Sequence, residues 1–218
     1  MIESVWIIGG GKFGSRASDA IRKAMPDCRI TVVDRKFARC QRFSEKGEDV
    51  VCSDGISFLT DLMKPRCEPE WIIPAMPIHV AYWWLRNHLE ISGIRVLPAP
   101  VPEAVSHRLP HPFSGGDDVL YTTCADFICP ENCPEPDDFC TVTRKPRPCT
   151  LYEELARMSC KEYLSIVIRS HQLLPGVGGY RPETLRKALE KIRENPHRTI
   201  LLSTACKCHG VVNAFFTR

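Results

Sequence analysis

Short hydrophobic runs alternate with amphipathic stretches along the first half of the chain. Apolar runs bounded by turn residues predict buried strands over residues 4–8, 29–33, 49–52, 71–73 and 94–97. Apolar positions at helical spacing predict helices over residues 12–25, 37–46, 54–63 and 78–91. Strands that alternate with helices in this way are typical of a parallel sheet with helices on both faces.

The pattern breaks off after residue 97 and returns at Leu151. Prolines at positions 98, 100, 102, 110 and 112 prevent regular structure there, although residues 119–123 predict one strand. Residues 125–150 are rich in cysteine, proline and acidic residues, with little apolar content. Such a segment has no core of its own, and a bound metal would be needed to order it.

The last part of the chain again alternates strands and helices. We expect helices over residues 151–158 and 182–194, and strands over residues 163–169, 199–203 and 211–216. This βαβ unit extends the first sheet or packs beside it. The predicted fold class is therefore α/β, a Rossmann-like parallel sheet with a Cys/Pro-rich insert and a C-terminal βαβ extension. The expected regions are a nucleotide-binding domain (1–97), a metal-binding insert (98–150) and a C-terminal α/β unit (151–218).

Composition narrows the classes of partner. The chain has 218 residues and a net charge of +3, and its 29 basic residues are spread out, so we expect no nucleic-acid partner. The longest apolar stretch, residues 71–85, contains Pro74, Pro77 and His79 and is too short and broken to cross a bilayer. With no signal peptide in sight, the expected location is the cytoplasm, without membrane insertion. A homodimer or another protein partner stays open.

The first predicted strand runs into a G-x-G-x-x-G pattern at Gly9, Gly11 and Gly14. Gly9 allows a tight turn, Gly11 lets the backbone approach a pyrophosphate, and Gly14 lets the following helix pack closely on the strand. The free N–H groups at the start of that helix favour an anion. A glycine turn that packs a helix and binds nothing is the simpler alternative.

An acidic residue, Asp34, ends the second predicted strand. A carboxylate here accepts hydrogen bonds from a ribose diol and repels a 2′-phosphate, which favours NAD over NADP. Arg35 weakens that preference, because a nearby guanidinium can hold a 2′-phosphate. The candidate nucleotide-binding residues in these two segments are Gly9, Gly10, Gly11, Lys12, Phe13, Gly14, Asp34 and Arg35.

These segments resemble a known family. The runs VWIIGGGKFG (5–14), TVVDR (31–35) and VVCSDG (50–55) are similar to the NAD-binding N-terminal domain of potassium-uptake regulators. The glycine run followed by Arg16 is also similar to the NAD-binding domain of siroheme-synthase-type precorrin dehydrogenases. The first resemblance implies a Rossmann fold that binds NAD and adds Asp54 as a contact near the adenosine. It covers residues 1–97, and neither family is matched beyond them.

Twelve cysteines are many for a cytoplasmic chain, where clustered thiols indicate metal ligands or redox centres. Cys129, Cys133 and Cys140 give the spacing C-x3-C-x6-C, with prolines after the first two. No C-x-x-C pair of a zinc ribbon and no ferredoxin spacing is present. The fourth ligand is open: Cys124, Cys149, or the distant Cys206, Cys208 and His209. Ordinary thiols and a structural zinc site are the alternatives to an iron–sulfur cluster, and the acids Glu131, Glu135, Asp137 and Asp138 are expected to be solvated.

No catalytic residue is identified. His79, at the start of a predicted helix, is a candidate acid or base but is more typical of a structural histidine. A second glycine loop at Gly176, Gly178 and Gly179 is either an anion cradle or a plain connection between strand and helix. The expected function is that of an NAD(P)-binding protein with a cysteine-ligated metal centre in redox chemistry. The alternatives are a non-catalytic NAD(H) sensor with structural zinc, and a metallochaperone or maturation factor that uses Cys206, Cys208 and His209.

Overall fold

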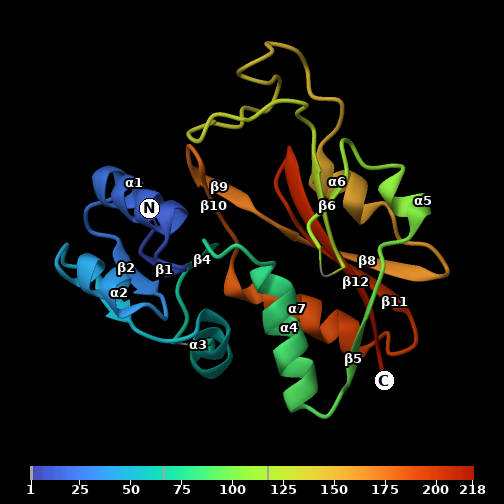
Figure 1. Ribbon diagram of the computed structural model, residues 1–218, viewed down its shortest axis with the longest axis horizontal. Coiled ribbons are helices and arrows are strands. Elements are labelled where there is room, and N and C mark those ends of the chain that lie inside the picture. The colour runs from blue at the N-terminus through green and yellow to red at the C-terminus, as the bar shows by residue number, and fades with distance from the viewer. Residues whose placement is uncertain (1, 66, 117) are drawn as a thin grey trace.

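A computed structural model describes residues 2–65, 67–116 and 118–218 of the chain. It contains two principal sheets, with helices α4 (Val80–Ile91) and α7 (Pro182–Arg193) packed between them (Figure 1). Within the described residues, no helix has both the length and the apolar character needed to cross a membrane.

The first sheet, sheet A, is parallel with the strand order β3-β2-β1-β4. Its strands are β1 (Ser4–Ile8), β2 (Arg29–Val33), β3 (Asp49–Val51) and β4 (Trp71–Pro74). Its helices are α1 (Lys12–Ala24), α2 (Phe37–Ser44) and α3 (Gly55–Leu62). Side chains alternate across β1: Ile7 packs with Ile21 of α1, whereas Trp6 packs edge-on against Phe58 of α3. The predicted α/β character and the parallel sheet are confirmed.

The second sheet, sheet B, is mixed and runs β6-β7-β12-β11-β8, with β5 also paired to β12. Its strands are β5 (Val96–Ala99), β6 (Phe113–Ser114), β7 (Val119–Thr123), β8 (Tyr163–Arg169), β11 (Thr199–Ala205) and β12 (His209–Thr217). Short helices α5 (Glu103–Ser106) and α6 (Leu151–Ala156) pack on it. β8 and β11 are parallel on either side of α7 in sequence, so the C-terminal βαβ unit is confirmed, and it lies in sheet B rather than in sheet A.

The fifth predicted strand does not join the parallel sheet. β5 pairs antiparallel with β12, where Pro98 lies opposite Phe215. The free edge of β4 is occupied instead by Tyr180, which exchanges two backbone hydrogen bonds of 2.9 and 3.0 Å with Ile72. Because β5 is an edge strand of sheet B, it tolerates Pro98, which has no N–H to donate.

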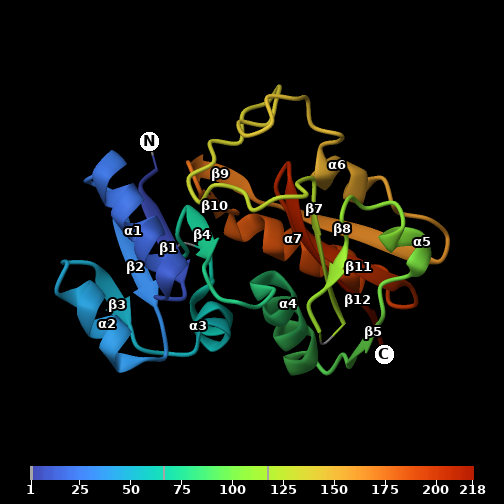
Figure 2. The same cartoon turned by 45° about the horizontal axis from the view of Figure 1, so that its top comes forward.

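The second glycine loop is an antiparallel hairpin of β9 (His171–Leu174) and β10 (Val177–Gly179), rather than a plain loop. It lies between β8 and α7 in sequence and reaches from sheet B to β4 of sheet A. Residues 124–150 contain no helix or strand and arch over this hairpin, drawn in yellow in Figure 2. The arch brings residues 124–150 close to the carboxyl ends of β1 in sheet A and of β8 and β11 in sheet B.

Candidate cysteine-lined site beside the glycine loop

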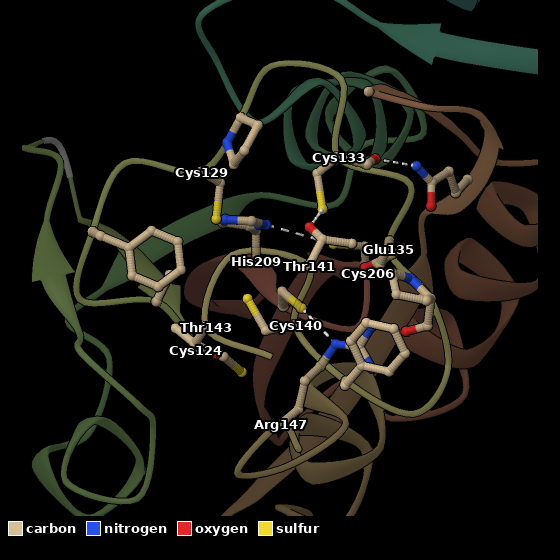
Figure 3. A pocket seen from close by; sticks show the side chains of 18 of the residues that line it. Cys124, Cys129, Cys133, Glu135, Cys140, Thr141, Thr143, Arg147, Cys206 and His209 are labelled. Carbon is tan, nitrogen blue, oxygen red and sulfur yellow. Dashed lines mark hydrogen bonds between the residues drawn. The ribbon is translucent and has the colours of Figure 1, made fainter. Parts of the chain in front are cut away.

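A cavity of about 400 Å³ lies under the arch of residues 124–150 (Figure 3). All six residues predicted as metal ligands line it, and so does Cys124. The lining donors are Cys124, Cys129, Cys133, Cys140, Cys206, Cys208 and His209. Two segments that are more than sixty positions apart in the sequence therefore bring their thiols to one space. Cys149 lies next to this wall, with its sulfur 3.8 Å from that of Cys124.

The turn between β11 and β12 presents the C-terminal donors. Its backbone closes where the N–H of Cys206 donates to the carbonyl of His209 at 2.9 Å. The sulfur of Cys206 lies 3.9 Å from Nδ1 of His209. The N–H of Cys124, just past β7, donates to the carbonyl of Cys208 at 2.8 Å. Sheet B therefore fixes the positions of this group of donors.

Acidic side chains hold the arch on that turn. Glu135 is half-buried, whereas Glu131, Asp137 and Asp138 are exposed to solvent as expected. The Glu135 carboxylate accepts a hydrogen bond from the N–H of Lys207 at 2.7 Å. Asp137 forms an ion pair with the Lys207 ammonium. The carboxylate of Glu131 is likewise paired, with cations of helix α1.

Charge within the cavity favours one thiolate. A hydrogen bond from the Cys124 thiol, together with Arg147, lowers the pKa of Cys208 to about 7, although burial opposes the shift. Nε of Arg147 lies 2.9 Å from the Cys208 sulfur. Burial, reinforced by Glu135, raises the pKa of Cys206 to about 12. The sequence analysis missed Arg147, because an arginine between two prolines carries no pattern that points to a thiol.

All twelve cysteines are free thiols. Among the described residues, no three histidine, cysteine, aspartate or glutamate side chains converge closely enough to hold one metal ion. The donors are instead distributed around the wall of the cavity (Figure 3). The arrangement is a space enclosed by thiols, rather than a closed tetrahedral site.

The glycine loop at the end of β1 has the backbone that its sequence predicts. Gly9 has a φ of +111°, a conformation that favours glycine. A Cβ on Gly14 would lie 1.9 Å from the Gly9 carbonyl oxygen, so helix and strand approach as closely as expected. Gly11 caps α1 without a side-chain hydrogen bond, which leaves the first-turn N–H groups without a side-chain cap. Contact with a pyrophosphate stays a prediction.

Asp34 is only 7% exposed and binds the glycine loop directly. Its carboxylate accepts hydrogen bonds from the N–H of Gly10 at 2.8 Å, the N–H of Lys36 at 2.8 Å and Nη1 of Arg39 at 3.0 Å. Burial raises the pKa of Asp34, but these donors together outweigh it and lower the pKa below its ordinary value. Arg39, rather than the exposed Arg35, is the cation beside this carboxylate.

The remaining candidates of the nucleotide region differ in their surroundings. Asp54 is the N-cap of α3, where its Oδ1 accepts from the N–H of Ile56 at 3.0 Å and of Ser57 at 3.1 Å. Phe13 is 65% exposed. The capping bonds give Asp54 a structural reason to be acidic, and its contact with adenosine stays a prediction.

The glycine-loop helix and the cysteine segment are in contact. The Glu131 carboxylate lies 2.6 Å from Nζ of Lys12 and 2.8 Å from Nη1 of Arg16. Nη2 of Arg16 also donates to the Glu131 carbonyl at 2.8 Å. The two predicted sites are therefore neighbours. The one signal in the sequence that could have marked Glu131 as a functional residue is its position between Cys129 and Cys133.

His79 is buried and has both ring nitrogens engaged. Nδ1 lies 2.7 Å from Oδ1 of Asn213 and Nε2 lies 2.9 Å from Oγ1 of Thr204. Burial lowers the pKa of His79 to about 4, so the ring is neutral at pH 7. A neutral ring that donates to Asn213 and accepts from Thr204 joins α4 to sheet B. This arrangement is typical of a structural histidine.

Comparison with known proteins gives a family. Residues 81–218 match the AF_1314_C family, described as "Uncharacterized protein, C-terminal domain". An uncharacterized protein of Archaeoglobus fulgidus is 30% identical over 220 aligned positions, which cover 95% of this chain and 97% of the relative. No solved structure matches the chain.

Proposed function

The chain belongs to the AF_1314_C family, and from that premise and the site geometry we propose that it is an NAD-binding redox protein with a cysteine-ligated iron–sulfur centre. One observation carries the proposal: thiols from residues 124–140 and 206–208 line a single cavity beside the glycine-loop helix. Thiolates are the ligands that iron–sulfur clusters and zinc prefer.

The distribution of the donors around the cavity favours a cluster over one zinc ion. Distributed donors fit a polynuclear group, because each iron of a cluster takes its own protein ligand, whereas zinc needs four donors at one point. A cluster needs four thiolates. We propose that they are four of the five cysteines Cys129, Cys133, Cys140, Cys206 and Cys208. When bound, the cluster would supply one-electron chemistry.

Residues around the donors support the same assignment. Arg147 donates to Cys208 and favours its thiolate, the form that binds metal. Hydrogen bonds to the sulfurs of a cluster tune its reduction potential. Glu135 and Lys207 fix the arch on the Cys206 turn, as supporting residues do at metal sites.

The nucleotide half of the proposal depends on the backbone of residues 9–14. The first turn of α1 offers N–H groups and cations to a pyrophosphate. A carboxylate has about four lone-pair directions, and Asp34 uses three of them within the chain, which leaves one for a ribose hydroxyl. We propose NAD as the ligand, with NADP admitted by Arg39 close to this carboxylate.

A second candidate function is a non-catalytic NAD(H) sensor with a structural zinc. The observation that favours it is that both ring nitrogens of His79, the one candidate acid or base of the sequence analysis, are engaged in hydrogen bonds within the chain. A sensor needs no free acid or base, whereas an oxidoreductase usually employs one.

Anaerobic purification followed by iron, sulfide and zinc analysis separates these functions. We expect broad visible absorption with stoichiometric iron and sulfide, lost in Cys129→Ser and kept in Cys67→Ser, which alters an exposed thiol outside the cavity. A colourless protein with one zinc would refute the cluster. Turnover of NADH with an artificial electron acceptor is expected for the redox protein and not for the sensor.

A further inference from the structure

Glu131 forms ion pairs with two cations that are expected to bind a nucleotide phosphate. Its carboxylate lies between Nζ of Lys12 and Nη1 of Arg16, at 2.6 and 2.8 Å. Lys12 is the first residue of α1, and Arg16 follows one turn later, so both cations flank the beginning of that helix. An anionic side chain from residues 129–133 is thus bound at the end of the helix that attracts anions.

The backbone around Glu131 is held from two sides. The Cys133 carbonyl accepts hydrogen bonds from Nε2 of Gln172 at 2.5 Å and from the N–H of Gly176 at 3.2 Å. A Cβ at Gly176 would lie 2.0 Å from the Glu131 carbonyl oxygen, so the β9–β10 hairpin packs directly on this peptide. The position of Glu131 is therefore coupled to the positions of Cys129 and Cys133, which flank it.

Binding of a dinucleotide and binding of a metal centre are then expected to oppose each other. A dinucleotide brings two phosphate charges to the first turn of α1, where the single Glu131 carboxylate already pairs with both Lys12 and Arg16. A metal centre bound to Cys129 and Cys133 restrains the residue between them, which lowers the entropy that Glu131 loses in holding its ion pairs.

We propose, as a step that rests on the proposed function, that Glu131 is a built-in competitor of the dinucleotide pyrophosphate and is strengthened by the assembled cysteine centre. The metal-loaded protein binds nucleotide more weakly than the metal-free protein. Because such coupling is reciprocal, bound nucleotide also weakens retention of the metal centre. Release of nucleotide thus accompanies assembly of the centre.

The test is a set of NADH titrations, followed by fluorescence, on metal-free protein and on protein reconstituted with iron and sulfide. We expect the loaded wild-type protein to bind NADH about fivefold more weakly than the metal-free protein, the size expected for exposed ion pairs. Glu131→Gln abolishes this difference and raises the affinity of the loaded form. Asp138→Asn removes one charge from the same segment, and among the described residues Asp138 forms no ion pair with α1, so this variant keeps the difference. Circular dichroism checks that both variants are folded.

The outcomes distinguish failure of the competition by Glu131 from failure of the proposed function. Equal NADH affinity in loaded and metal-free wild-type protein, or a difference that survives in Glu131→Gln, overturns the competition and leaves the proposed function standing. Failure of every form to bind NADH, or failure of the protein to take up metal, overturns the proposed function and the competition with it.

Discussion

The glycine loop and the cysteine site lie side by side, yet they are formed in different ways. The loop is set by nearby sequence: a close approach between Gly9 and Gly14, and an Asp34 carboxylate that binds Gly10. The cysteine site joins distant segments through irregular chain, and polar contacts such as Glu135 to Lys207 hold it closed. The difference teaches that the first region is held by contacts between neighbouring stretches of one sheet, whereas the second is held by contacts between distant segments, so a ligand is predicted to matter more for its order.

Removal of the metal centre is expected to have the largest effect, and to loosen the cysteine segment while sheet A stays folded. Structural metals contribute on the order of 10 kcal/mol to small domains, so Cys129→Ser with Cys206→Ser should leave residues 124–150 open to proteolysis. NADH binding should persist, because sheet A does not need the metal. Mass spectrometry of limited digests, with Cys67→Ser as the control, checks both points. Equal protection of the segment with and without metal would contradict the contrast.

Two glycine substitutions test the glycine loop, one for its stability and one for nucleotide binding. Gly14→Ala forces a Cβ to within 1.9 Å of the Gly9 carbonyl and should lower the free energy of unfolding by about 3 kcal/mol. At Gly11 the nearest atom, Nη1 of Arg39, is 3.7 Å away, so Gly11→Ala should change stability by only about 0.5 kcal/mol. Because that methyl group faces the expected pyrophosphate, NADH affinity should still fall about tenfold.

Denaturant unfolding with calorimetric NADH titration measures both quantities for each glycine variant. If Gly11→Ala binds NADH as the wild type does, the nucleotide does not lie where the glycine pattern predicts.

The pH dependence of stability tests the junction between α4 and sheet B, the sheet that carries the Cys206 turn. The neutral ring of His79 has a pKa of about 4 in the folded protein against 6.5 when exposed. The unfolded chain therefore takes up a proton first as pH falls, and the stabilisation present above pH 6.5 is lost between pH 6.5 and 4. At pH 5 the loss should be about 2 kcal/mol. Denaturant unfolding at pH 7 and 5 should show the full loss in the wild type and in His107→Gln, a surface control, and a loss smaller by this amount in His79→Gln, where the other histidines with a lowered pKa still contribute.

The smallest effect is expected at Arg147. The guanidinium lies beside the Cys208 sulfur, so it would stabilise the negative charge added on reduction of the proposed cluster. Arg147→Met should therefore make the midpoint potential more negative by tens of millivolts, and Arg147→Lys should restore part of the change. An anaerobic redox titration followed by visible absorption measures it. An unchanged potential in Arg147→Met would place the metal away from Cys208.

Sequence reasoning succeeded where neighbours along the chain decide the structure. The bounds of β1 and β2 and the turn at Gly9 follow from local patterns. The pairing of β5 with β12 was not predictable, because it depends on Tyr180 occupying the edge of β4. For the site, cysteine density identified residues that line one cavity, but the contacts of Glu131 with α1 and of Arg147 with Cys208 depend on how distant loops fold together.

Crystallography of anaerobically prepared protein, with diffraction recorded on both sides of the iron absorption edge, tests the central claim most directly. The account predicts an anomalous iron peak inside the cavity, within bonding distance of sulfurs from both residues 124–140 and 206–208. A cavity without a metal peak, or one whose cysteines are joined to each other as disulfides, would contradict it.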